Sequence, residues 1–257
     1  MDNKNRYTIN GFNDLCSIIE NISENVINMK SEIMITKPTL WYRGQANENW
    51  TITPSIYRNN NRKSEQVLCH LFYHGATQIM PQKIPKNSYD QWITVIQHYG
   101  LPTRLLDWTY SHLIALFFAL NNNDKLKNYD ASITIIIPEP LNETQEFDPY
   151  IYPIDSSSAL NLLVPAFNKK LSNSNKILAC FSTSNDLRMY AQRAAFTIHD
   201  TNKDLFEAID DEFIYTITIP RHRKHYLKRI LSFLDIKENF MFPDLSHVAQ
   251  QAKIRHL

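Results

Sequence analysis

The sequence predicts a single α+β domain with a central mixed or antiparallel split sheet flanked by helices. Segments with apolar residues at helical spacing are interspersed with β-branched segments, without the regular alternation of a βαβ protein. The chain has 257 residues and is 43% hydrophobic, which is enough to bury one substantial core. It shows no internal repeat, low-complexity tract or convincing linker. We therefore expect one folded unit.

The first elements are expected to be two amphipathic helices separated by a short strand. Residues 13–31 predict a helix because apolar side chains recur at helical spacing at Leu15, Ile18, Ile22 and Val26. Residues 40–43 predict a strand that ends at Gly44. Residues 64–79 predict the second helix, with an apolar face formed by Val67, Leu68, Leu71 and Phe72.

The next elements are defined by stop and start signals. Ser88 is suited to cap a third helix, which Gly100 ends and Pro102 prevents from resuming. Residues 103–108 then predict a short extended segment. Residues 111–120 are almost entirely apolar, which predicts a buried helix.

The second half of the chain is expected to alternate between strands and helices. Residues 131–137 are β-branched and predict a strand terminated by Pro138, and residues 142–158 have the composition of a loop. The remaining expected elements are helices over 158–171 and 185–193, strands over 176–181, 195–199 and 213–219, a basic helix from Pro220 to Leu234, and a last helix over 246–255.

The amino-acid composition indicates in which cellular compartment the protein works and which classes of partner it can bind. The net charge of +1 gives the whole molecule no strong field toward nucleic acids or acidic membranes. Three dispersed cysteines have neither metal-ligand spacing nor the pattern of a disulfide framework. The polar N-terminus lacks the apolar region of a signal peptide, and no apolar run is long enough to span a membrane. We therefore expect a cytoplasmic protein with no metal and no membrane contact.

The segment Trp41-Tyr42-Arg43-Gly44-Gln45 is the first candidate for a binding site. An arginine at the end of a buried strand offers a rigid fork of donors that fits phosphate or carboxylate. The adjacent Gly44 is one of only four glycines and would let a ligand approach the backbone. The alternative is a structural Arg43 that pairs with a carboxylate of the core.

The segment from Gln97 to Thr109 is the second candidate. It gathers chemically useful side chains around a helix stop and a short strand, at His98, Tyr99, Thr103, Arg104, Asp107 and Trp108. Alternation along a strand would place Thr103 and Asp107 on one face. The alternatives are that His98 only complements the helix dipole and that Asp107 only makes a salt bridge, to Arg43 or Arg104.

Two further segments contain polar clusters. Arg188 and Gln192 are four residues apart on an expected helix and share a face, a pattern that is more often a solvated polar surface. A basic cluster then follows Pro220, at the helix end that disfavours cations. An anionic nucleic-acid or protein target would explain this cluster, and a solvated basic face is the alternative. Its members are Arg221, Arg223, Lys224, Lys228 and Arg229.

These segments, in this order, resemble the FRG domain, whose Phe-Arg-Gly-like motif stands here as Tyr42-Arg43-Gly44. The segment 98–109 with 115–119, the Arg-x-x-x-Gln pattern of 188–192, and the ending Met241-Phe242-Pro243-Asp244-Leu245 also match. The resemblance implies an FRG domain over 37–257, with 1–36 as a helical segment packed on it. One departure is Ala194, where family members often carry glycine. The family often occurs in toxin-like, antiphage or other bacterial conflict contexts.

The order of the motifs is also distantly similar to the ADP-ribosyltransferases, which use NAD. That resemblance implies catalytic roles for Arg43, Thr103 and Gln192, with Asp107 supplying the anion that the neutral Gln192 lacks. It also implies an ADP-ribosyltransferase-like fold and NAD as the substrate. The residues expected to bind the nucleotide are Tyr42, Gly44, Gln45, His98, Tyr99, Arg104, Trp108 and Arg188.

Three alternatives remain open from the sequence. A second mapping onto the same superfamily uses Arg43, the Ser182-Thr183-Ser184 tripeptide and Glu212. A non-catalytic sensor of nucleotides or nucleic-acid ends would need no carboxylate at the third motif. A hydrolase or nuclease would use His98 and Asp107 as an acid–base pair. The sequence does not predict the acceptor, the trigger or the oligomeric state.

Overall fold

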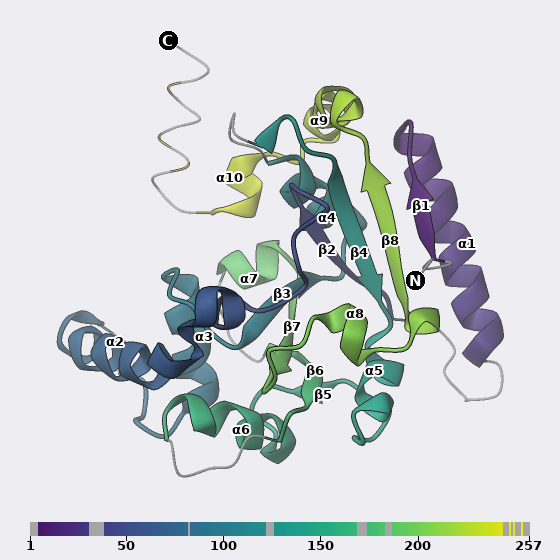
Figure 1. The fold of residues 1–257 in the computed structure, drawn as a ribbon. Helices are drawn as coiled ribbons and strands as arrows, with labels where there is room; N and C mark the ends of the chain where they lie inside the picture. The colour runs from purple at the N-terminus through teal and green to yellow at the C-terminus, as the bar shows by residue number, and fades with distance from the viewer. Residues whose placement is uncertain are drawn as a thin grey trace.

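The computed structural model describes residues 5–30, 39–81, 83–121, 126–168, 174–182 and 187–243, together with 247, 249 and 253. Within these residues the chain is an α+β protein with one eight-stranded sheet flanked by helices (Figure 1). The strand order is β1-β8-β4-β2-β3-β7-β6-β5. The pairs at the two edges, β1 with β8 and β5 with β6, are parallel, and the inner pairs are antiparallel.

The strands are short, and most of their residues are buried. Their bounds are β1 Arg6–Thr8, β2 Trp41–Gln45, β3 Leu105–Thr109, β4 Ala131–Ile136, β5 Tyr152–Pro153, β6 Ile177–Phe181, β7 Ala194–His199 and β8 Ile214–Ile219. The β-branched residues expected to form strands do so in β4 and β8. These two strands pair over six residues and form the middle of one half of the sheet.

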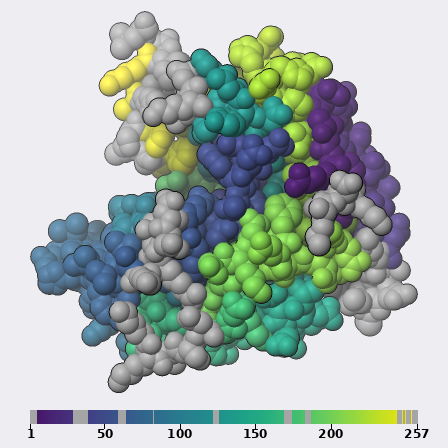
Figure 2. Space-filling model, in the orientation of Figure 1, coloured from purple at the N-terminus to yellow at the C-terminus, as the bar shows by residue number. Residues whose placement is uncertain are grey.

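The helices lie on both sides of this sheet and at its ends. The α-helices are α1 Phe12–Lys30, α2 Glu65–Ile79, α3 Tyr89–His98, α4 His112–Leu120, α5 Pro138–Thr144, α6 Ser157–Leu163, α7 Leu187–Ala191, α8 Leu205–Ala208, α9 Lys224–Phe233 and α10 Glu238–Met241. The 3-10 segments are η1 Ser55–Ser64, η3 Val164–Ala166, η4 Asp211–Phe213 and η5 Arg221–Arg223. In Figures 1 and 2, α2 projects at the side of the molecule opposite α1.

The sequence predicted most of these elements, and several details were wrong. The predicted split sheet is a single continuous sheet. Gly44 lies inside β2 and does not end it, because β2 pairs with β4 through Gln45. Pro138 begins α5 within a region expected to end in a loop, since proline is well tolerated in the first turn of a helix. The expected helix 158–171 is shorter, and β1 and η1 were not predicted.

Two predictions fall largely outside the described residues. The helix expected over residues 246–255 is described only at 247, 249 and 253, and the boundary expected between residues 36 and 37 lies in the segment 31–38. The helix α1, however, packs on the rest of the chain. Its apolar side chains join one buried cluster with α4, α9 and strands β4 and β8, and these side chains are Leu15, Ile19, Ile22 and Val26.

The centre of the sheet contains a local divergence that matters for function. Strands β2 and β3 are neighbours, yet their register includes one pair, Tyr42 opposite Thr109. On its other side β2 pairs with β4 along its whole length, and β3 pairs with β7 in the same way. The two strands therefore separate beyond this pair, where Arg43 and Gly44 are half-buried and Asp107 is exposed.

Close packing of α4 on β2 explains the glycine in the middle of the strand. A Cβ atom at Gly44 would lie 1.8 Å from the carbonyl oxygen of Ala115 and 2.6 Å from the backbone nitrogen of Ala119. Both are backbone atoms of α4, so neither moves independently of the helix. Gly44 was expected to admit a ligand to the backbone, but the space that it leaves is occupied by α4.

A buried ion network fixes the segment that precedes β3. The guanidinium of Arg104 donates to Glu65 over 2.6 and 3.0 Å, to Asp200 over 3.1 Å and to the carbonyl oxygen of Leu162 over 2.6 Å. Arg104 is only 2% exposed. Burial alone lowers the pKa of Arg104, but hydrogen bonds and charge from Glu65, together with Asp200, raise it above its usual value. Arg104 therefore ties α2, α6 and the end of β7 to the start of β3.

Replacing Arg104 by methionine is expected to destabilise the fold by about 3–5 kcal/mol, because two buried carboxylates lose their counter-ion. Urea denaturation followed by circular dichroism measures the change. The matched control is Lys176→Met, which breaks an ion pair to Glu146, whose side chain is 82% exposed, and should change the midpoint little. Equal midpoints for Arg104→Met and the wild type would show that the network does not stabilise the fold.

Candidate functional site

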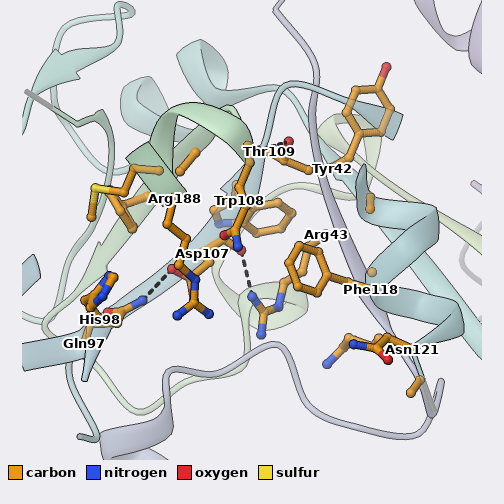
Figure 3. A pocket seen from close by; sticks show the side chains of 18 of the residues that line it. Tyr42, Arg43, Gln97, His98, Asp107, Trp108, Thr109, Phe118, Asn121 and Arg188 are labelled. Atoms are coloured by element: carbon orange, nitrogen blue, oxygen red, sulfur yellow. Dashed lines mark hydrogen bonds between the residues drawn. The ribbon is translucent and has the colours of Figure 1, made fainter. Parts of the chain in front are cut away.

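A cavity of about 370 Å³ lies beside the divergence of β2 and β3. It is within the size range of small-molecule sites. Its walls come from β2, β3, β7, α3, α4, α7, η1 and the loop before η1 (Figure 3). Most residues that the sequence singled out line it, namely Tyr42, Arg43, Gly44, Gln45, His98, Asp107, Trp108, Arg188 and Gln192.

The guanidinium of Arg43 bridges the gap between the two diverging strands. Its Nη1 donates to the backbone carbonyl oxygen of Asp107 over 2.7 Å, and the side chain extends into the pocket in Figure 3. Withdrawal from water lowers the pKa of Arg43 to about 10, with Arg58 lowering it further and Asp107 opposing the shift. Arg43 therefore remains a cation near neutral pH. Among the described residues, Asp107 is its one hydrogen-bond partner, so most of its N–H donors remain for a ligand.

Asp107 supplies the carboxylate of the pocket. Its Oδ1 accepts a hydrogen bond of 2.5 Å from Gln97 Nε2. The residue is exposed to the cavity, but protein atoms around it displace water and raise the pKa of the carboxyl group. The charge of Arg43, the Gln97 hydrogen bond and the charge of Arg188 all oppose this rise in pKa. One carboxylate is thus held among cations inside a concave site.

Thr103 lies behind this carboxylate and does not line the cavity. Its hydroxyl donates to Gln97 Oε1 over 2.5 Å, and it is 0% exposed. Thr103 precedes β3, which begins at Leu105, so the strand expected over 103–108 does not extend to it. Thr103 and Asp107 are connected through the Gln97 side chain.

Two more arginines bring positive charge to the same cavity. Arg58 from η1 and Arg188 from α7 both line it. The carboxylate of Asp107 raises the pKa of Arg58 against the larger effect of desolvation, and Arg188 lowers the pKa of Asp107. In Figure 3 the guanidinium groups of Arg43 and Arg188 both extend toward the open middle of the pocket. Among the described residues that line the cavity, the arginines outnumber the carboxylates, which favours an anionic ligand.

The C-terminal motif packs against the wall formed by α7. The guanidinium of Arg188 lies over the ring of Phe242, 4.6 Å from its centroid, a geometry that favours cation–π attraction. Gln192 Nε2 donates to the carbonyl oxygen of Met241 over 3.0 Å, and the Gln192 carbonyl accepts from Thr109 over 2.7 Å. Gln192 therefore links α7 and α10 to β3, and its amide nitrogen is engaged by the protein.

Aromatic side chains form the apolar part of the lining. Trp50 is 45% exposed at the pocket, and Phe118 contributes from α4. Trp108 is almost fully buried and donates from Nε1 to Thr197 Oγ1 over 3.0 Å. Its indole therefore supports the floor of the pocket and has no exposed ring face on which a ligand could stack. The ring of Tyr42 points away from the middle of the pocket in Figure 3.

Several predicted site residues lie elsewhere. Arg104 was predicted to bind the nucleotide, but its guanidinium is committed to the buried network described above. Tyr99 is 65% exposed beyond the end of α3 and is not part of the lining. For the second mapping, Glu212 lies in the exposed segment η4 and does not line the pocket, and Thr183 and Ser184 are outside the described residues.

The basic cluster after Pro220 is less uniform than the sequence suggested. Lys224 was predicted as part of a surface for polyanions, but it is only 6% exposed and donates to the carbonyl oxygens of Ala46 and Leu126. Arg221, Lys228 and Arg229 are exposed, and Arg223 is half-buried. A buried lysine that satisfies backbone carbonyls is structural, which reduces the surface available to a polyanion.

Gln97, Arg58, Trp50 and Phe118 are among the lining residues that the sequence did not single out. Gln97 had a usable signal, since it is the first residue of the candidate segment that ends at Thr109. Arg58 lies in a 3-10 segment that has no hydrophobic periodicity, and Trp50 lies in a loop. Phe118 is one of many apolar residues of α4, and nothing in the sequence distinguishes it from the core.

Neither a membrane span nor a metal centre is found among the described residues. None of their helices has the length and apolar character needed to cross a bilayer. No group of three or more histidine, cysteine, aspartate or glutamate side chains in that part of the chain is placed to bind a metal ion.

Comparison with known proteins identifies the region around this pocket. No curated protein and no solved structure matches the chain. A family model of the FRG domain matches residues 38–128, which include β2, α3, β3 and α4. These elements supply Arg43, Gln97, Asp107 and Phe118 to the pocket. Residues 38–128 are therefore similar to the FRG domain, and this matched segment forms one side of the candidate site.

Proposed function

We propose that the pocket binds NAD or a closely related nucleotide and that the protein is an ADP-ribosyltransferase-like enzyme, in keeping with the toxin-like contexts of FRG domains. The observation that carries the proposal is the grouping of Arg43, Arg58 and Arg188 around the Asp107 carboxylate. Guanidinium groups match the geometry and charge of phosphates. An exposed indole at Trp50 suits a planar base, and the carboxylate suits a centre that becomes positive during bond cleavage.

The chemistry assigned to these residues is limited to binding and charge stabilisation. Breaking the bond between ribose C1′ and nicotinamide leaves the electron pair on nicotinamide and positive charge on the ribose. Among the described residues that line the pocket, Asp107 is the carboxylate that can stabilise that charge. The acceptor, either water or a nucleophilic group of a target molecule, supplies the new bonding pair to C1′ and releases its proton. Arg43 then serves to hold phosphate and not to transfer protons.

A non-catalytic nucleotide sensor is the second candidate. It is favoured by Gln192, because this neutral residue stands at the position where the resemblance to ADP-ribosyltransferases implies a carboxylate. The side-chain nitrogen of Gln192 also donates to the carbonyl oxygen of Met241. A sensor would use the same arginines to bind the nucleotide and would release no nicotinamide. Binding and turnover must therefore be measured separately.

Replacing Arg43 by alanine is expected to weaken NAD binding by about 10- to 100-fold, through the loss of charge-assisted hydrogen bonds. Titration calorimetry measures the affinity, and nicotinamide release measures turnover. Arg43→Lys keeps the charge but lacks the planar fork, so an intermediate affinity is expected. The control is Arg229→Ala, which removes an exposed cation of α9 outside the pocket.

The outcomes separate the candidates. Binding with nicotinamide release supports the transferase, and binding without release supports the sensor. If NAD and its component nucleotides fail to bind the wild type, or if Arg43→Ala binds as tightly as the wild type, the nucleotide assignment is wrong.

A further inference from the structure

Two short hydrogen bonds connect the buried Thr103 to the pocket carboxylate. The Thr103 hydroxyl donates to Gln97 Oε1, and Gln97 Nε2 donates to Asp107 Oδ1, each over 2.5 Å. We propose that Gln97 is a positioning residue that keeps Asp107 ionised and oriented toward the ligand, and that Thr103 fixes the orientation of the Gln97 amide. These roles rest on the nucleotide chemistry proposed above for the same pocket.

Thr103 and Asp107, at the two ends of this series of hydrogen bonds, select one orientation of the Gln97 side-chain amide. An ionised carboxylate can only accept hydrogen bonds, so the NH₂ group of Gln97 must face Asp107. The amide oxygen then faces Thr103, whose hydroxyl is the donor there. The backbone N–H of Leu105 donates to Thr103 Oγ1 over 3.3 Å, so this hydroxyl accepts from one neighbour and donates to the other. All three side chains therefore form compatible hydrogen bonds when Asp107 is ionised.

The reverse orientation requires a proton on Asp107. A protonated carboxyl would donate to the amide oxygen of Gln97, and the NH₂ group would then face Thr103. The Thr103 proton would lose its acceptor, and among the described residues no second acceptor contacts this hydroxyl. Thr103 is 0% exposed, so water does not replace the lost partner. A buried donor without a partner is disfavoured, so Thr103 keeps the NH₂ group of Gln97 facing Asp107, where it stabilises the ionised carboxylate more than the protonated one.

The charged groups around Asp107 come from several elements. Arg43 lies on β2, Arg58 on η1 and Arg188 on α7, and His98 lines the pocket from α3. Desolvation raises the pKa of Asp107, whereas Arg43, Gln97 and Arg188 lower it. The contribution of Gln97 is separable from the others, because Gln97→Leu removes the hydrogen bond and leaves every charge in place.

The pKa of the Asp107 carboxyl tests the proposal directly. It is measured by a carbon-13 NMR titration of the full chain without nucleotide, using Asp107→Asn to assign the resonance. In Gln97→Leu we expect an upward shift of about one pKa unit, as for the loss of a hydrogen bond to a charged group. In Thr103→Val we expect a smaller upward shift, and Thr103→Ser, which keeps the hydroxyl, should match the wild type.

Each outcome decides a separate point. An Asp107 pKa that is unchanged in both Gln97→Leu and Thr103→Val overturns the proposal, and a shift in Gln97→Leu alone overturns the role of Thr103. If Gln97→Leu does not fold, the near-isosteric Thr103→Val and Thr103→Ser pair decides the matter. If the expected shifts occur but the wild type releases no nicotinamide, the proposed enzyme is wrong and the positioning of Asp107 stands. If it does release nicotinamide, the acidic midpoint of that activity should rise with the pKa of Asp107.

Discussion

Replacing Asp107 by asparagine is expected to slow nicotinamide release about 10²- to 10³-fold and to change NAD affinity little. The size of Asn is close to that of Asp, but it carries no charge to stabilise the positive ribose, and losses of this size follow removal of a single electrostatic contact to a transition state. Single-turnover release of nicotinamide, measured together with calorimetric binding, separates the two effects. A loss confined to binding would mean that Asp107 contacts the bound nucleotide without helping to cleave it.

The matched control is Glu212→Gln. The alternative mapping assigns the essential carboxylate to Glu212, whereas the structure places this residue on exposed η4, outside the lining of the pocket. We expect Glu212→Gln to keep the wild-type rate. A large loss there, with Asp107→Asn active, would favour the alternative mapping.

Replacing Gly44 by alanine is expected to lower the free energy of unfolding by more than about 3 kcal/mol, at or beyond the upper range for overpacked cores. The new Cβ would overlap the backbone of α4 at Ala115 and Ala119, so β2 and α4 must separate. That separation also displaces Phe118, which lines the pocket, so nucleotide binding should be lost with the stability. Thermal unfolding followed by circular dichroism measures the effect.

Gly75→Ala is the control for this substitution. Gly75 is exposed on helix α2, and a Cβ there would meet no atom within 4 Å. Alanine in a helix interior is favoured over glycine by about 0.5–1 kcal/mol, so this variant should be slightly more stable than the wild type. If Gly44→Ala unfolded at the wild-type temperature, the close packing of α4 on β2 would not be essential to the fold.

The sequence predicted the elements whose signals are local. Helices α1, α3 and α4 and strands β4 and β8 combine clear periodicity or β-branching with definite ends, and the positive φ of 82° at Gly100 agrees with its predicted stop role. The parallel pairing of β1 with β8 depends on residues more than 200 positions apart, and no local pattern indicates it. The same holds for the divergence of β2 from β3, which depends on the strands on either side.

The candidate site shows the same limit. Arg43 and Asp107 were predicted because each stands in a short motif beside a strand, and both line the pocket. Arg104 stands in the same motif as Asp107, and the sequence alone makes it an equally suitable candidate for binding a ligand. Its role depended on where Glu65 and Asp200 fold, and these residues carry no motif of their own. The sequence thus identified the important segments, and the tertiary structure separated binding residues from structural ones.

The pairing of β2 and β3 has a consequence for the modularity of this domain. The matched segment 38–128 contains both strands, but their register includes a single pair. The long ladders that hold them are with β4 and β7, which lie after residue 128. An excised fragment 38–128 would therefore lose most of its interstrand hydrogen bonds, along with Arg188 and Gln192 of the pocket wall. We therefore expect that segment 38–128 does not fold on its own and that grafting it alone onto another protein would transfer neither the fold nor the site.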